Sequence, residues 1–267
     1  MSFSNPTLEN PCKKFIDFKS DDKQFVYWDK ERGEKGEQVI IPAPIYFIVL
    51  DELTTITGYY KEGDCGIYSN EVHRTTEEIL KVRTFKKGGP IITGLYDAIK
   101  ASIKEIGGKY TRSIYAMLIN PDGTTELVNF RFKGAAFSAW LDAEKHINTS
   151  SRVVCITGDF TEGKNGKTVY NIPVFKAFAM KDEYRKAAIE MDGLLQSYLK
   201  DYKSRQAEKE TAREESTEAP VSQPISQMPM SAAPNRDGKF DAVPSDVREL
   251  ELASDLPFDI EPREPKF

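Results

Sequence analysis

The chain has 267 residues, 39% of them hydrophobic and 30% charged, with a net charge of −5. This length is sufficient for a buried core, and no run approaches the roughly 20 apolar residues that a membrane helix requires. The first ten residues carry no basic, apolar leader, so we expect no signal peptide and no membrane association. The expected location is the cytoplasm, which would be the host cytoplasm for a phage-encoded protein.

Acidic residues are concentrated in one part of the chain. Residues 201–267 contain fifteen acidic and nine basic side chains, whereas residues 1–200 contain 27 acidic and 28 basic ones. A nearly neutral core can still carry a local basic surface, so the overall charge does not exclude a nucleic-acid partner. The three cysteines, Cys12, Cys65 and Cys155, are too scattered for a disulfide framework, and we expect free thiols.

Strand patterns dominate residues 13–178. They consist of short segments rich in aromatic and β-branched residues, separated by polar or glycine-containing stretches such as the predicted loop 30–38. Asn120–Gly123 and Gly163–Gly166 have the composition of hairpin turns. The predicted strands are 14–19, 24–28, 45–60, 79–85, 112–119, 126–132, 153–160 and 168–178.

Three helices are predicted. Residues 91–106 place isoleucines on one face and end at a Gly-Gly pair, and residues 135–147 direct Trp140 inward. Residues 181–210 form a longer helix with apolar side chains at helical spacing, and its second half becomes increasingly charged. From about Thr211 the composition shifts to Glu, Ser, Pro, Gln and Ala, which predicts a disordered acidic tail over 211–267.

Catalytic and metal motifs are weak. Residues 158–164 have the spacing of a phosphate-binding loop, but Asn165 replaces the required Ser or Thr and a strand follows instead of a helix. We therefore interpret this segment as a hairpin tip. His73 and His146 are isolated, and no cysteine pair has zinc spacing. The expectation is a protein that is not an enzyme and needs no cofactor or metal.

Basic residues recur beside aromatic residues on the predicted strands. Bases of a single strand stack on aromatic rings while cations follow the phosphates, so this mixture favours single-strand binding. Lys81, Arg83 and Phe85 alternate and therefore share one strand face. Tyr27, Phe47 and Phe130 lie in more apolar surroundings and are expected in the core. The predicted nucleic-acid-binding residues are Trp28, Tyr59, Tyr60, Lys61, Tyr68, Arg74, Lys81, Arg83, Phe85, Lys86, Lys87, Lys109, Tyr110, Arg112, Tyr115, Arg131 and Lys133.

The end of the chain carries a more specific pattern. Asp255, Leu256, Pro257 and Phe258 resemble the Asp-Ile-Pro-Phe tip of bacterial single-stranded-DNA-binding proteins, although nine residues follow Phe258 here. The layout, with Phe267 as a terminal aromatic, is also similar to single-stranded-DNA-binding proteins of tailed phages. The resemblance implies an OB-type barrel with inserted helices and a tail that docks replication or recombination proteins through Asp255–Phe258 and Phe267.

The sequence thus predicts a β-rich α+β fold. Residues 1–180 would form an OB-like, partly open barrel with inserted helices, residues 181–210 a long helix, and residues 211–267 the tail. The expected function is sequence-independent binding of single-stranded DNA in replication or recombination, and a homo-oligomer is possible. Two alternatives stay open: a phage structural or assembly protein with a β-rich domain, and a nuclease, which would need clustered carboxylates near a basic groove.

Overall fold

The computed structural model describes residues 8–217, without the side chains of Ser150 and residues 206–217. The predicted docking residues Asp255–Phe258 and Phe267 therefore lie outside the described residues. The chain divides into two compact units, of which one contains the chain up to Lys164 together with Val169–Lys203. All the contacts that follow lie within this unit. Among the described helices, none is both long and apolar enough to cross a membrane.

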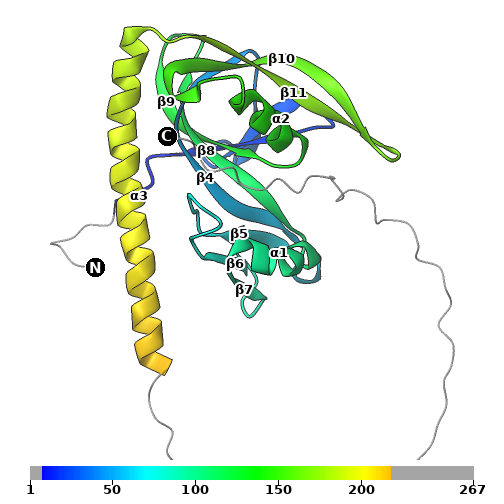
Figure 1. Ribbon diagram of the computed structural model, residues 1–267, viewed down its shortest axis with the longest axis vertical. Coiled ribbons are helices and arrows are strands. Elements are labelled where there is room, and N and C mark those ends of the chain that lie inside the picture. The colour runs from blue at the N-terminus through cyan, green and yellow to red at the C-terminus, as the bar shows by residue number, and fades with distance from the viewer. Residues whose placement is uncertain (1–7, 218–267) are drawn as a thin grey trace, which may run out of the picture. The chain divides into compact units, whose positions relative to one another are not determined.

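The described part of the chain is rich in strands and contains three α-helices and two short 3-10 helices (Figure 1). The strands are β1 Lys14–Lys19, β2 Gln24–Asp29, β3 Glu37–Ile41, β4 Ile45–Tyr60, β5 Cys65–Ser69, β6 Leu80–Thr84, β7 Ile91–Gly94, β8 Gly108–Ile119, β9 Thr125–Phe132, β10 Arg152–Asn165 and β11 Thr168–Ala179. The helices are α1 Tyr96–Glu105, α2 Ala135–Glu144 and α3 Asp182–Thr217, with η1 at Lys61–Gly63 and η2 at Thr149–Ser151.

One mixed sheet contains all these strands. Its order is β3-β2-β1-β9-β8-β4-β5-β6-β7, and β10 pairs with both β4 and β11. The β1–β9 pair is parallel, whereas β4 pairs with its neighbours in antiparallel fashion. The path from β3 to β7 does not return on itself, so the sheet of the described residues is not closed.

The long strand β4 organises the sheet. One of its edges pairs with β8 from Tyr46 to Gly58, with a register shift between Val49 and Asp51. Its other edge pairs with β10 at Ile45–Phe47 and with β5 at Gly58–Tyr60. Figure 1 shows α1 and β5–β7 at one end of the β4–β8 pair, and β10 and α2 at the other.

Two separate apolar clusters occupy these two ends. Near α2, the rings of Phe47, Phe130 and Trp140 are fully buried, and Phe47 and Phe130 lie 4.6 Å apart between ring centroids. Near α1, Ile99 and Ile103 pack on residues of β4, β5 and β6. The predicted core positions Phe47 and Phe130 are confirmed as buried, and Tyr27 packs against the same cluster.

Helix α3 covers part of the sheet with its first half. Leu195 and Leu199 are buried against Leu53 and Tyr115, and Ala188 packs near Ile48. Polar contacts add to this attachment: Gln196 donates to Asp51 at 3.0 Å, and Lys203 lies 3.4 Å from Glu78. The helical spacing of apolar residues predicted this packed face.

Most predicted strands and both predicted hairpins are confirmed. The chain additionally forms β3, where a loop was predicted as far as Gln38, and β5, for which no strand was predicted. Both strands are short, and both gain their order from pairing, β3 with β2 and β5 with β4 and β6. The order of these two strands therefore comes from their partner strands, which the composition of the segments themselves does not reveal. The three cysteines are free thiols, as expected.

The helix boundaries differ from the predictions at two places. The prediction begins a helix at Ile91, but Ile91–Gly94 is the strand β7 and the helix begins at Tyr96. Pairing of these β-branched residues with β6 overrides the helical spacing. Helix α3 also continues through Thr217, past the predicted end near 210, because residues 207–215 consist mainly of the strong helix formers Ala, Glu, Lys and Arg.

Candidate nucleic-acid interface

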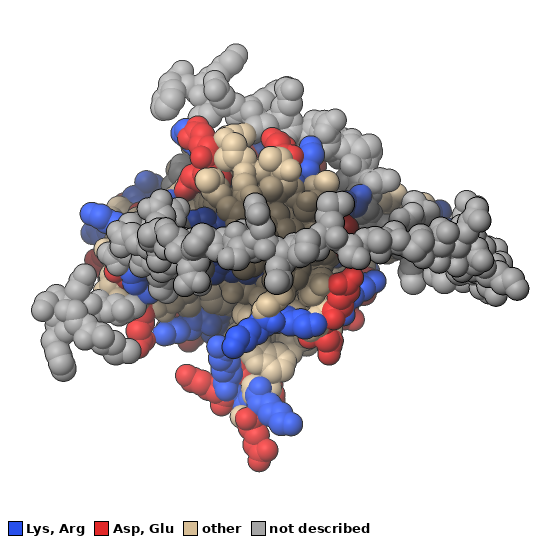
Figure 2. Space-filling model, turned by 90° about the horizontal axis from the view of Figure 1, so that it is seen from below, with Lys and Arg blue, Asp and Glu red and all other residues tan. Residues whose placement is uncertain are grey.

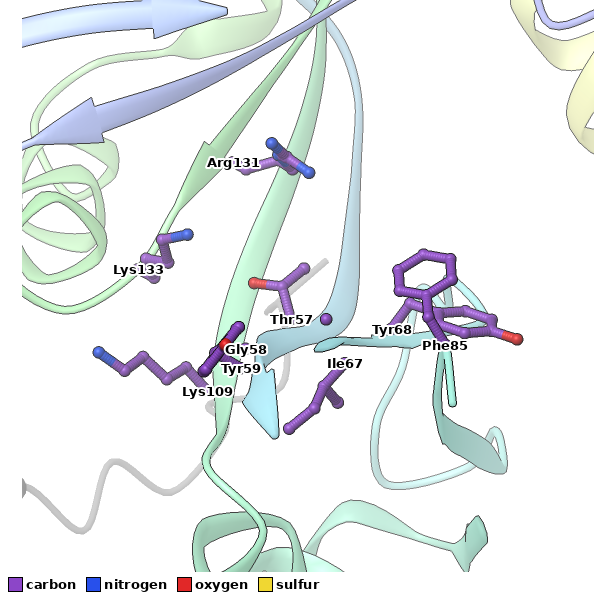
Figure 3. A pocket seen from close by; sticks show the side chains of 10 residues that line it. Thr57, Gly58, Tyr59, Ile67, Tyr68, Phe85, Lys109, Arg131 and Lys133 are labelled. Atoms are coloured by element: carbon purple, nitrogen blue, oxygen red, sulfur yellow. The ribbon is translucent and has the colours of Figure 1, made fainter. Parts of the chain in front are cut away.

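A groove of about 490 Å3 lies where β4, β5, β8 and β9 come together (Figure 3). In this view Tyr68 and Phe85 lie on one side, Arg131 and Lys133 on the other, and Thr57 between them. Six of the seventeen predicted nucleic-acid-binding residues line it. The full lining is Thr57, Gly58, Tyr59, Gly66, Ile67, Tyr68, Phe85, Lys109, Arg131 and Lys133.

The aromatic side of the groove is an exposed, stacked pair. The rings of Tyr68 and Phe85 lie 4.6 Å apart between centroids with an interplanar angle of 30°, and Phe85 is 71% exposed. Gly66 makes this arrangement possible, because a Cβ at that position would lie 3.0 Å from the Phe85 ring. The exposed ring faces are accessible to an unpaired base, so the pair is suited to stacking.

The opposite side carries the charge. Lys109, Arg131 and Lys133 are the charged residues of the groove lining, and all three are cationic. Asp17 of β1 pairs with Arg131 and lies 3.2 Å from the Lys133 ammonium. The Arg131 guanidinium also lies 5.7 Å from the centroid of the Phe15 ring. These contacts hold two cations in position while leaving a net positive lining.

Besides Arg112, six more predicted residues are basic and lie outside the groove lining. Arg74 pairs with Glu77 at 3.0 Å, and Lys86 donates to the Glu62 carbonyl at 3.5 Å. Strand β6 has Leu80, Val82 and Thr84 buried, so the predicted common face of Lys81 and Arg83 is the less buried one. Apart from Arg112, the basic residues outside the groove lining are Lys61, Arg74, Lys81, Arg83, Lys86 and Lys87.

Two predicted aromatic residues also lie outside the groove lining. Trp28 is 57% exposed at the end of β2 and packs close to Gly36. Tyr60 packs against the α1 cluster, and its hydroxyl donates to Glu62 at 2.7 Å. Tyr59, by contrast, lines the groove and is 53% exposed, with its hydroxyl bonded to Asp64.

Three predicted residues are corrected by the structure. Tyr115 is only 2% exposed, so its ring cannot stack on a base. Tyr110 packs edge-on against Tyr96, and its hydroxyl lies 3.1 Å from that of Thr54. Arg112 is held in a carboxylate cluster. These residues occur on the same strand pattern as the groove residues, but the Tyr115 side chain is buried, and those of Tyr110 and Arg112 are half-buried against other side chains.

The Arg112 cluster lies between the sheet and α2. The guanidinium is 3.0 Å from Glu52 and 3.9 Å from Glu144, and the Trp140 indole donates to Glu144 at 2.8 Å. Burial, followed by the hydrogen bond and charge of Glu52, raises the pKa of Glu144 to about 8. The cluster therefore contains a protonated carboxyl at neutral pH and serves to join α2 to β4 and β8.

A second, smaller pocket of about 240 Å3 adjoins the groove. The two share Thr57, Tyr68 and Arg131 as lining residues. Glu71 lies in this side pocket, where its carboxylate accepts hydrogen bonds from the hydroxyls of Ser113 and of Tyr115, the latter at 2.7 Å. Burial raises the pKa of Glu71, an effect that these two hydrogen bonds oppose. The side pocket is lined by Asn10, Phe15, Thr55, Thr57, Tyr68, Ser69, Glu71, Tyr115, Arg131, Tyr198 and Tyr202.

Sequence reasoning missed several lining residues. Gly58 and Gly66 lie inside strands, and an interior glycine in a strand often marks close approach of another group. That signal could have identified them, since a Cβ at Gly58 would lie 2.3 Å from the Gly107 carbonyl oxygen. Glu71, Tyr198 and Tyr202 had no comparable signal, because they reach the side pocket from a loop and a helix distant in sequence.

Basic and acidic side chains are interleaved on the face shown in Figure 2, over the part that the grey residues leave in view. The groove lining itself is cationic, because its charged residues are Lys109, Arg131 and Lys133. A locally positive groove can attract a phosphate chain even when the remaining surface is mixed.

No protein-family model, curated protein or solved structure matches this chain. The geometry of the groove and of the side pocket is therefore the basis on which a function can be proposed.

Proposed function

We propose that the protein binds single-stranded DNA in the groove between the Tyr68–Phe85 pair and the cations Lys109, Arg131 and Lys133. One observation carries the proposal: rings and cations from β4, β5, β8 and β9, from the β6–β7 connection and from the residue after β9 line a single open groove. Unpaired bases would stack on the rings, and the phosphates would follow the cations. The binding is non-catalytic and coats exposed strands during replication or recombination.

The free energies of stacking and of phosphate contacts are consistent with binding that does not depend on base sequence. Stacking contributes about 1–3 kcal/mol per base, and every base has a face that can stack. Each phosphate contact releases condensed counterions, so the affinity falls as salt increases. A phosphate would displace or share the Asp17 contacts of Arg131 and Lys133. Asp17 thus keeps the cations oriented in the free protein and reduces the net gain on binding.

We further propose that the sheet is an OB-like, partly open barrel with α1 and α2 as insertions. The sharing of β4 between β8 on one edge and β5 and β10 on the other supports this interpretation. The proposal also retains replication or recombination partners bound through the tail, a cytoplasmic location and a possible homo-oligomer. Residues 218–267 lie outside the described residues, and the tail hypothesis depends on their sequence alone.

The direct test is titration of a labelled oligo-dT of about 16 nucleotides, near the upper site size of one OB fold, at two salt concentrations. Fluorescence anisotropy should show binding that weakens with salt. Tyr68→Ala combined with Phe85→Ala should reduce the affinity at least about tenfold, because stacking on both rings is lost.

Phe178→Ala is a matched control, since Phe178 is an aromatic residue on β11 that is 46% exposed and outside the groove lining. It should bind oligo-dT as the unmodified protein does. Absence of binding by the full chain, or equal affinity for the double variant and the control, would overturn the proposed function.

A further inference from the structure

The side pocket has the features of a site for a single planar ring. Phe15 and Tyr68 line it together with Tyr198 and Tyr202 of α3. Its volume of about 240 Å3 lies below the roughly 300–1,000 Å3 typical of pockets for drug-sized ligands. Because it shares Thr57, Tyr68 and Arg131 with the groove, a strand lying in the groove could turn one base into it.

Glu71 gives this pocket its chemistry. A carboxylate has about four acceptor positions, and the described residues supply two donors, the hydroxyls of Ser113 and Tyr115. Each carboxylate oxygen thus receives one hydrogen bond and keeps capacity for a second. A buried carboxylate with unused acceptor capacity is costly, so a ligand that brings two adjacent N–H donors would be stabilised there.

Arg131 complements Glu71 from the same lining. Its guanidinium has five N–H donors and bonds Asp17 through Nη2, while its buried Nε has no partner among the described residues. Its positive charge is also near enough to Glu71 to lower the pKa of that carboxyl, against the larger effect of burial. The pocket thus offers acceptors from Glu71 beside donors from Arg131.

We infer that the side pocket takes a guanine base of the bound single strand, with Glu71 accepting from the guanine N1–H and N2–H groups and Arg131 donating to its O6. Guanine alone among the four DNA bases presents two adjacent donors on its Watson–Crick edge. Thymine offers only N3–H there, and adenine and cytosine offer one amino group each. Single strands are commonly recognised through this edge with aromatic stacking on the base face.

This inference rests on the proposed function and adds a base preference to it. The groove stacks any base, whereas the side pocket favours one, so the affinity should depend on whether a guanine is present. A bidentate contact of this kind discriminates against a wrong base by about tenfold or more. The preference for guanine depends on Glu71, whereas stacking of any base in the groove depends on the Tyr68–Phe85 pair.

The test compares three labelled oligonucleotides of about 16 nucleotides on the full chain: all-dT, dT with one central guanine, and dT with one central hypoxanthine. Hypoxanthine is guanine without its 2-amino group. The guanine strand should bind about tenfold more tightly than all-dT, and the hypoxanthine strand should lose most of that gain. This comparison requires no protein variant and so does not depend on any variant folding.

Glu71→Gln should lower the affinity for the guanine strand to the affinity of the same variant for all-dT, because an amide has only one acceptor oxygen. Glu126→Gln is the control, since Glu126 pairs with Lys14 on the same sheet and is absent from both linings. Equal binding of all three strands, or a preference that persists in Glu71→Gln, would overturn the inference and leave the proposed function intact. Failure to bind any of the strands would overturn both.

Discussion

Two arginines on neighbouring strands have opposite environments. Arg112 of β8 lies opposite Phe132 of β9, and Arg131 of β9 lies opposite Ser113 of β8. Because side chains alternate along a strand, the two guanidinium groups point to opposite faces of the sheet. Arg112 is enclosed with Glu52 and Glu144 beneath α2, whereas Arg131 lines the groove and the side pocket.

The difference shows that the role of a basic residue on a strand depends on which face of the sheet its side chain occupies. On the α2 face, the Arg112 guanidinium pairs with Glu52 beside the protonated Glu144 and helps to hold α2. On the other face, cations with one shared carboxylate partner, Asp17, line an open groove. Stability should therefore respond to changes on the first face, and nucleic-acid affinity to changes on the second.

Arg112→Met should have the largest effect. It leaves Glu52 and Glu144 buried without their cation, and loss of one member of a buried ion pair costs about 3 kcal/mol or more. Urea denaturation should show this decrease in the free energy of unfolding, while the folded variant binds oligo-dT normally. An equal loss of affinity in the folded variant would contradict the separation of the two faces.

Glu144→Gln should alter the pH dependence of stability. The pKa of Glu144 in the folded protein, about 8, exceeds its ordinary value of 4.5. Its protonated form therefore stabilises the fold fully below pH 4.5, and this contribution is lost as the pH rises through 8. Denaturation at several pH values should show the unmodified protein losing about 2 kcal/mol more than the variant over this range. Parallel pH profiles would contradict the assignment.

Lys109→Ala combined with Lys133→Ala tests the groove side. Each lysine that contacts a phosphate of a single strand contributes about 0.7 to the salt slope, so the double variant should reduce that slope by about 1.4. The affinity at low salt should fall about tenfold with little change in thermal stability. Lys100→Ala combined with Lys145→Ala is the control, since Lys100 pairs with Asp97 in α1, and Lys145, the residue after α2, pairs with Asp142.

Tyr115→Phe should have the smallest effect. The change removes one hydroxyl donor to Glu71 and should cost about 1 kcal/mol in the free energy of unfolding. Oligo-dT affinity should not change, because the buried ring does not reach the groove. A loss of affinity without a loss of stability would show that the Tyr115 hydroxyl takes part in binding.

Local patterns in the sequence predicted the long central strand, both hairpins and the packed half of α3. These elements have strong periodicity or strong turn chemistry over consecutive residues, as in Asn120–Gly123. Strands β3, β5 and β7 were not predicted, because these short segments are ordered by pairing with adjacent strands of the sheet. At Ile91–Gly94, pairing with β6 outweighs a helical spacing that extends into α1.

The sequence predicted the type of candidate site but not which residues line it. The mixture of rings and cations indicated single-strand binding, and Tyr68, Phe85 and Arg131 do line one groove. The local sequence does not show that Arg131 lines a groove and Arg112 does not, since both lie on strands that contain aromatic residues, and the sheet register decides which face each one occupies. The side pocket depends on Tyr198, which arrives from a helix more than sixty residues later in the chain.

The double pairing of β4 has a consequence for synthesis of the protein. Its Ile45–Phe47 segment pairs with Val154–Ile156 of β10, which leaves the ribosome about a hundred residues later. At roughly 5–20 residues per second, the gap between completing β4 and translating β10 is on the order of 5–20 s. During that interval one edge of the nascent strand offers unpaired amides and carbonyls, the kind of edge through which chains aggregate. Translation speed between Tyr60 and Ile156 should therefore influence how much protein reaches its native state.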